Sequence, residues 1–233
     1  MSVEGGPDIV TNGLVLYLDA ANNRSIVSGS TTWFDLSRNG NTGSLINGPT
    51  YSSANGGNIV FDGTDDWVTI PAGTSFAYGT GDFTVEAWAK PNPSITTVYG
   101  GVIYSQVVSG TNYFIWGVNP TSDPKTYFIA TVSGGGTGLN GPNYTPGAWN
   151  HIVFSRISGV IYSYTNTIAG ATQNNSANLN NTTYVPTIGD ETHHGGNDPY
   201  AGGIGSIRIY NGKGLTAREI RQNYHATKGR YGL

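Results

Sequence analysis

The 233-residue chain contains no cysteine and one methionine, and only 11% of its residues are charged. Without cysteine the fold has no disulfide bonds, so it can assemble in a reducing cytoplasm. The shortage of Lys, Arg and Glu removes good helix formers and argues against a helical protein. No run of about 18 apolar residues occurs, which excludes a transmembrane helix.

The N-terminal stretch MSVEGGPDIV lacks the basic and apolar regions of a signal peptide. We therefore expect delivery outside the cell, if it occurs, to use another route. The formal net charge of −3 offers no overall attraction to nucleic acid or to an anionic membrane. We expect no nucleic-acid partner and no membrane partner.

What the chain has in abundance is glycine, with 35 residues, and tyrosine, with 15. Short apolar or alternating runs recur between Gly, Asn and Pro clusters, for example LVLYLD, NYFIWGV, TYFIATV and SIRIYN. In DFTVEAWAK the period is 2, with Phe83, Val85 and Ala87 on one face and Glu86 and Trp88 on the other. The pattern predicts an all-β, antiparallel two-sheet jelly-roll sandwich forming one domain over residues 1–233, with a core at about 13–226.

One segment, GLTAREIRQNYHATKG, predicts a short C-terminal α-helix at about 217–226. Thr216 and Glu219 have the spacing of a capping box, and Leu215 and Ile220 that of a hydrophobic staple. The basic residues here allow two interpretations, a solvated face or a surface that docks an acidic partner. The candidates for docking are Arg218, Arg221, Lys228 and Arg230.

Read in order, the stretches LYLDAANN, DLSRNGNTGSL, FDGTDDWVTI, FTVEAWAK, AWNHIVFSR and GIGSIRIYNGKGLTAREI resemble the laminin-G-like, concanavalin-A-like jelly-roll domains. The resemblance implies two packed antiparallel sheets with ligand or calcium sites in the rim loops. The ends, GGPDIVTNGLVLYLDAAN and NYHATKGRYGL, resemble virion proteins of tailed bacteriophages, including cyanophages. That resemblance implies assembly in the host cytoplasm and a place on the particle surface.

A possible calcium site begins at DLSRNGNTGSL, where Asp35, Asn39 and Asn41 alternate as in the opening of an EF-hand loop. The loop is no EF-hand, because its twelfth residue is Ile46 in place of Glu. The family resemblance implies that such turns help to bind a structural Ca²⁺, although Gly205 stands where many relatives carry an Asp. The alternative is that these side chains only form turns with their own backbone.

Ligand binding is expected from two further regions. The Gly-rich segment GDETHHGGNDPY offers Asp190, His193, His194, Asp198 and Tyr200 to a ligand, whereas adjacent His residues in an extended segment point to opposite faces and are poorly placed to share a metal. In NYFIWGV, the aromatic residues Tyr113 and Trp116 can stack on a sugar or form a subunit contact.

Catalysis lacks its usual pattern. The acids Asp62, Asp65 and Asp66 fall in one turn, and the Glu-x-Asp-x-x-Glu strand motif of concanavalin-A-like glycanases is absent. Glu86 is the one acid within a clear strand pattern, without the second carboxylate that glycoside hydrolysis needs. We therefore expect a non-catalytic virion surface protein, a capsid decoration or a tail or fibre component, trimeric by hypothesis. It would adhere to neighbouring virion proteins or host-surface polysaccharide. The alternative is a cellular carbohydrate-binding module or glycoside hydrolase.

Overall fold

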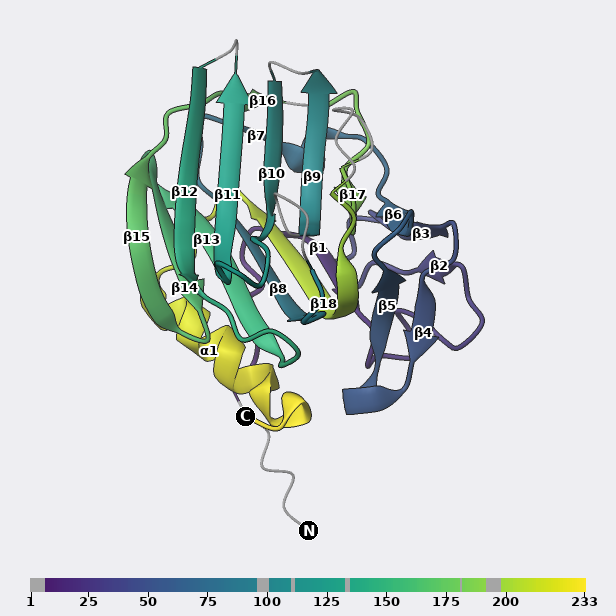
Figure 1. The fold of residues 1–233 in the computed structure, drawn as a ribbon. Coiled ribbons are helices and arrows are strands. Elements are labelled where there is room, and N and C mark those ends of the chain that lie inside the picture. Colours follow the sequence, from purple (N-terminus) through teal and green to yellow (C-terminus); the bar gives the residue numbers. More distant parts are fainter. Residues whose placement is uncertain (1–6, 96–100, 110–111, 133–134, 181, 192–197) are drawn as a thin grey trace.

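The computed structural model describes residues 7–95, 101–109, 112–132, 135–180, 182–191 and 198–233. Two eight-stranded antiparallel sheets, here called sheet A and sheet B, pack face to face, with one C-terminal helix outside sheet A (Figure 1). This confirms the predicted all-β jelly-roll sandwich. In the described part of the chain no helix is both long and apolar enough to cross a bilayer.

Sheet A has the strand order β15, β14, β13, β8, β18, β5, β4, and β1 pairs with β18 beside this path. Its strands are β15 (Ile168–Asn174), β14 (Val160–Thr165), β13 (Asn150–Ile157), β8 (Phe83–Pro91), β18 (Ala201–Asn211), β5 (Asn58–Asp62), β4 (Thr50–Ser52) and β1 (Leu14–Asp19).

Sheet B has the order β12, β11, β10, β9, β17, β6, β3, β2. Its strands are β12 (Gly135–Asn143), β11 (Lys125–Val132), β10 (Asn112–Val118), β9 (Gly101–Ser109), β17 (Thr187–Ile188), β6 (Trp67–Thr69), β3 (Gly43–Ile46) and β2 (Thr32–Trp33). A small third sheet pairs β16 (Leu179–Asn180) with β7 (Ala77–Gly79), and short 3₁₀ turns form η1 (Ala54–Gly56), η2 (Thr74–Phe76) and η3 (Lys228–Tyr231).

The core lies between the sheets and follows the alternation of the strands. On β8, Phe83, Val85 and Ala87 point into it, as the period of 2 predicts. Aromatic rings fill the middle: Phe128 of sheet B lies 6.2 Å from Phe83 and 5.8 Å from the ring of Phe154 on sheet A. The inner face of each sheet is apolar and packed against the other sheet. Any specificity for a ligand therefore has to come from the outer faces.

The outer face of sheet A is covered by α1 (Ala217–Thr227), which confirms the predicted helix. Its N-terminus has the capping box: the Thr216 side chain accepts from the Glu219 backbone N–H, and the Glu219 carboxylate accepts from the Thr216 N–H at 2.8 Å. Ile220 of α1 is fully buried in an apolar cluster with Val153 and Tyr210 of sheet A. Closing this face requires the polar groups of sheet A to find partners under the helix.

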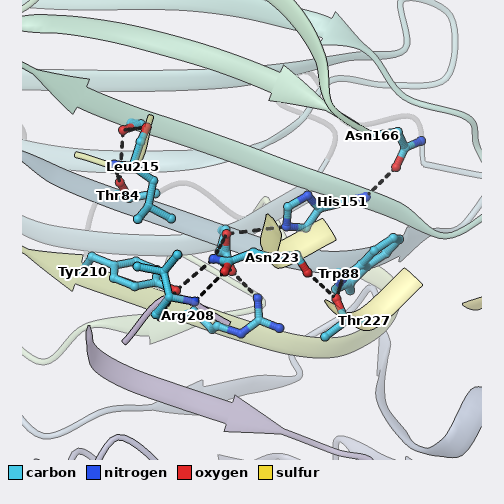
Figure 2. Close-up of polar contacts among 12 residues, drawn as sticks. Thr84, Trp88, His151, Asn166, Arg208, Tyr210, Leu215, Asn223 and Thr227 are labelled. Atoms are coloured by element: carbon cyan, nitrogen blue, oxygen red, sulfur yellow. Dashed lines mark hydrogen bonds and ion pairs between the residues drawn. The ribbon is translucent and has the colours of Figure 1, made fainter. Parts of the chain in front are cut away.

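The main polar group under α1 is the carboxylate of Glu86, which is 1% exposed. Figure 2 shows Arg208, Tyr210 and Asn223, which lie close together. The Glu86 carboxylate is ion-paired with the Arg208 guanidinium and accepts two hydrogen bonds from Asn223 Nδ2 at 3.1 Å, while His151 Nε2 lies 3.5 Å away. Asn223 also donates to the Tyr210 hydroxyl at 3.0 Å. This network joins β8, β13, β18 and α1.

The environment of Glu86 favours its charged form. Burial alone would raise the pKa of the Glu86 carboxyl, but the Arg208 charge, with contributions from His151 and Asn223, lowers that pKa to about 2. Glu86 therefore stays ionised and bound within the protein under all ordinary conditions.

Replacing Arg208 by Met should destabilise the fold strongly, because it leaves the Glu86 carboxylate buried without its cation. We expect a loss of about 3–5 kcal/mol in the free energy of unfolding. Urea titration at neutral pH measures it.

The control is Asp123→Ala, which removes the exposed ion pair between Asp123 and Lys125. That pair should contribute less than about 1 kcal/mol. A similar small loss for both variants would contradict the role of the Arg208 pair.

Candidate functional site

The outer face of sheet B carries an apolar patch that α1 does not cover. It comprises Val102, Val107, Ile115 and Tyr127, which are buried, and Tyr113 and Ile129, which are partly exposed, and we call it the aromatic face. The register sets these residues side by side on β9, β10 and β11: Tyr113 lies opposite Val107, and Ile115 lies opposite Ile129. The alternate residues Phe114 and Trp116 point into the core.

The surface over β11 and β12 is hollowed beside the aromatic face. A shallow cavity of about 200 Å³ is lined by Asn119, Tyr127, Ile129, Gly138 and Asn140, with Phe128 and Leu139. A Cβ at Gly138 would meet no atom within 4 Å, so the absent side chain leaves open space there. We call this feature the Gly138 hollow. Its rim amides are joined by a hydrogen bond of 3.4 Å from Asn119 Nδ2 to Asn140 Oδ1.

Acidic groups lie at the other side of the aromatic face, where β17 follows β9. Ser105 Oγ lies 2.6 Å from Thr187 Oγ1, and both hydroxyls donate to the carbonyl of Asp190, at 3.3 and 2.7 Å. Val102 N donates to the carbonyl of Asp198 at 3.1 Å, which holds this segment against β9. Burial, with repulsion from Asp198, raises the pKa of the Asp190 carboxyl to about 6. Burial also raises the pKa of Asp198.

The structure brings together only some of the residues that the sequence suggested for ligand binding. Tyr113, Asp190 and Asp198 gather on or beside the aromatic face. His193 and His194 lie outside the described residues.

Trp116 and Tyr200 must be removed from the ligand-binding set, because both are fully buried in the core. Trp116 packs against Phe154 and Tyr200 against Phe61, at ring separations of 6.3 and 6.0 Å. Strand alternation turns Trp116 away from the face that carries Tyr113.

Several residues of the site were missed at the sequence level. TYFIATV predicts a strand, but the pattern assigns no role to its outward side chains Tyr127 and Ile129. The hollow depends on Gly138 and on two Asn residues that only the pairing of β11 with β12 brings together. The alternation signal was present in TYFIATV; the neighbouring strand was not identifiable from a Gly-rich sequence.

The predicted calcium ligands make hydrogen bonds within the protein. Asp35 accepts through both carboxylate oxygens, from Tyr17 N at 2.9 Å, Ser37 N at 2.8 Å, Ser37 Oγ at 2.7 Å and Asn41 N at 3.0 Å. Asn41 Nδ2 and Asn39 Nδ2 donate to the carbonyls of Val15 and Leu14. The geometry supports the turn interpretation, since donors surround the carboxylate that a cation would need.

The structure gives a reason for glycine at position 205, where the family resemblance leads one to expect an Asp. A Cβ at Gly205 would lie 2.4 Å from the Tyr231 hydroxyl, so a side chain there would displace the C-terminal segment. Tyr231 in turn stacks on Trp88 at 4.2 Å.

A different acidic group could hold a cation. The carboxylate oxygens of Asp62, Asp65 and Asp66, in the turn between β5 and β6, all lie within 4.8 Å of one another. Burial raises the pKa of Asp66, whose Oδ2 accepts from Asp62 N at 2.9 Å. Within the described ranges this is the one group of acids close enough to share an ion, and Ca²⁺ is the ion that such oxygen ligands suit.

The four basic residues proposed for docking have different environments. Arg218 and Arg221 are exposed on α1. Lys228 lies over the Tyr224 ring at 5.7 Å. Arg230 is not free for docking, because it pairs with Asp19 at 2.5 Å and donates to the Gly205 carbonyl at 3.0 Å, which fastens η3 to the sandwich.

The family is shown by the sequence itself. A family model described as the concanavalin A-like lectin/glucanases superfamily matches residues 62–221, so the chain belongs to that superfamily. No curated protein matches the sequence.

Solved structures share the fold at low sequence identity. Domain 4 of AbnA, a GH43 extracellular arabinanase from Geobacillus stearothermophilus, in complex with arabinotriose, is 19% identical with a TM-score of 0.67, over 89% of this chain and 96% of that one. The binding domain of Paraclostridial Mosquitocidal Protein 1 is 13% identical with a TM-score of 0.69, over 90% of this chain and 51% of that one.

The binding domain of botulinum neurotoxin serotype D is 14% identical with a TM-score of 0.69, over 94% of this chain and 52% of that one. This chain thus spans about half the length of the two toxin domains. A likeness at this identity shows the fold alone.

If Asp35 only forms a turn, its contribution to stability should not depend on calcium. Asp35→Ala should lower the free energy of unfolding by about 2 kcal/mol or more, because it removes charge-assisted hydrogen bonds. Denaturant titrations in calcium and in chelator should give the same loss. Stabilisation of the wild type by calcium that disappears in Asp35→Ala would show instead that Asp35 is a ligand.

The raised pKa of Asp190 predicts a pH dependence. The folded-state pKa of about 6 exceeds the reference value of 3.8, so the contribution of Asp190 to stability is complete below 3.8 and is lost as pH rises through 6. The difference in free energy of unfolding between wild type and Asp190→Asn should change across this window, measured by denaturant titration at several pH values. Asp123→Asn, at an exposed acid, is the control; an Asp190 difference that stays constant contradicts the prediction.

Proposed function

We propose that this protein is a non-catalytic glycan-binding domain and that the aromatic face with the Gly138 hollow is its binding surface. The observation that carries the proposal is the combination of an apolar side chain with amide groups in one hollowed area: the partly exposed Ile129 beside Asn119 and Asn140. Tyr127 also lines the hollow but is 3% exposed. Sugar rings present C–H groups to aromatic and aliphatic surfaces and hydroxyls to amides. The arabinotriose complex of the AbnA domain supports a carbohydrate partner for this fold.

The same proposal holds that the protein does not cleave the glycans that it binds. Hydrolysis of a glycoside needs two carboxyl groups about 5–10 Å apart across the bond. The Glu86 carboxyl is engaged by Arg208 and Asn223 beneath α1, on the sheet opposite the aromatic face. The three turn acids lie in a single cluster between β5 and β6.

We further propose that the protein is displayed on a tailed-phage virion, as capsid decoration or as part of a tail or fibre. The support is the resemblance of the two chain ends to such virion proteins, and the use of jelly rolls in both viral capsids and lectins. The exposed Arg218 and Arg221 of α1, on the side away from the aromatic face, would meet an acidic virion partner. The botulinum toxin binding domain solved with rat synaptotagmin II supports a protein partner as the other option for this fold.

One observation favours a second candidate, a glycoside hydrolase. Asp190 and Asp198 lie near the aromatic face and both have raised pKa values, as a general acid requires. Incubation with the polysaccharides that bind, followed by a reducing-end assay, decides between the two. Release of reducing ends by the wild type and not by Asp190→Asn would replace the non-catalytic proposal.

Filling the hollow should abolish glycan binding without unfolding the protein. Gly138→Val places a β-branched side chain in open space on an edge strand, where it costs little stability. On a glycan array we expect at least about a tenfold loss of affinity, equivalent to 1.4 kcal/mol. The thermal midpoint should not change.

The matched control is Ala171→Val, at an exposed position of β15 in the other sheet. It should leave glycan binding intact. Equal binding by Gly138→Val and the wild type would place the glycan elsewhere. For the virion role, mass spectrometry of purified particles should detect the protein, and its absence from them would remove that part of the proposal.

A further inference from the structure

A second cavity lies at the opposite side of the molecule, at one end of sheet A. It has a volume of about 290 Å³ and is lined by residues of the end of β8, the start of β18 and the segment from β4 through η1 to β5. Its lining includes Lys90, Asn92, Asn55, Asn58, Trp149 and Gly203, and we call it the Trp149 cavity. No Asp or Glu of the described chain lines it.

The indole of Trp149 forms a fixed wall of this cavity. Its Nε1 donates to Asn55 Oδ1 at 3.0 Å, and its ring packs against Tyr231 at 4.7 Å. Asn55 is held at φ 55 within η1, so the acceptor is part of a tight turn. Trp149 is 7% exposed, so a small part of its surface reaches the cavity that it lines.

The floor is shaped by the lack of a side chain at Gly203. A Cβ there would lie 2.8 Å from Asn58 Oδ1 and 3.3 Å from Trp149 Cη2. Asn58 is fixed by a hydrogen bond of 3.1 Å from its Nδ2 to the Ala54 carbonyl. Glycine at position 203 therefore allows the Asn58 amide and the Trp149 indole to lie close to the backbone beneath the cavity.

The free groups in the cavity are hydrogen-bond donors. Lys90 is exposed, and its ammonium has no ion pair or hydrogen bond among the described residues. Asn92 Oδ1 accepts from Ser94 N at 2.9 Å and Ser94 Oγ at 2.7 Å, which directs its own amide donors elsewhere. A cation and amide donors beside an aromatic edge, with no acid present, favour a ligand that has both a negative charge and an apolar ring face.

We propose that the Trp149 cavity binds a carboxylated sugar residue of the uronic-acid type. The sugar carboxylate pairs with the Lys90 ammonium, the Asn92 amide donates to a ring hydroxyl, and the C–H face of the ring contacts Trp149. The volume holds about one such residue. This site lies on the other sheet from the Gly138 hollow and stands on its own lining, so it does not depend on the hollow being a glycan site.

The test is isothermal titration of the full chain with glucuronic acid and galacturonic acid oligomers, with the matching neutral oligomers of glucose and galactose as comparison. The variants are Lys90→Gln, Gly138→Val and the control Lys125→Gln, at an exposed lysine of β11. We expect the wild type to bind the uronates at least about tenfold more tightly than the neutral sugars. Lys90→Gln should lose that preference, whereas Gly138→Val and Lys125→Gln should keep it.

Two results would overturn the proposal: equal affinity for uronates and neutral sugars, or an unchanged preference in Lys90→Gln. Loss of the preference in Gly138→Val would move the uronate to the hollow and also overturn it. Neutral glycans should still bind Lys90→Gln and should not bind Gly138→Val. That result would support the proposed function and would show that the Gly138 hollow and the Trp149 cavity are separate sites.

Discussion

The buried charge of Glu86 constrains the rest of the molecule. A carboxylate inside a protein has to be paired, and here Arg208 from β18 and Asn223 from α1 supply the partners. Asn223 reaches this carboxylate because α1 lies on the outer face of sheet A. With α1 there, the outer face of sheet B becomes the broad surface on which an apolar patch is left outside the core.

The difference between the two outer faces, one packed against α1 and the other not, is what lets a widely used fold take on a particular role. The same sandwich serves an arabinanase domain and toxin binding domains, so the fold does not define the ligand. In this chain two glycines shape the outer surfaces. Gly138 opens the surface of sheet B, and Gly203 lets Trp149 and Asn58 meet at the end of sheet A. Both hollows combine apolar surface with amides, and the proposed glycan binding rests on that combination.

Much of the fold could be predicted from the sequence, because it depends on local signals. The alternation in DFTVEAWAK gave the inward face of β8, and the Thr216 capping box gave the start of α1. The identity of the candidate site was less accessible. Trp116 and Tyr113 are three residues apart and lie on opposite faces, and the sequence did not indicate which face was the core.

Other features depend on contacts between distant segments. Asn223 lies three residues after Ile220 and therefore on the buried face of α1, but its partner Glu86 is 137 residues away in the chain and could not be named from the sequence. The Trp149 cavity likewise joins residues from four separate segments. The Asp35 motif leaves two interpretations open at the level of sequence, because the spacing that suits calcium also suits a turn in which backbone N–H groups donate to the carboxylate.

The central claim is that glycans bind the outer face of sheet B and are not cleaved there. The most direct measurement is a two-dimensional ¹H,¹⁵N NMR titration of the labelled protein with an array-selected oligosaccharide, with the sugar signals followed in the same sample. We predict shift changes concentrated in β10, β11 and β12, with an unchanged oligosaccharide spectrum. Shift changes confined to other parts of the chain, or the appearance of new reducing-end signals, would contradict the account.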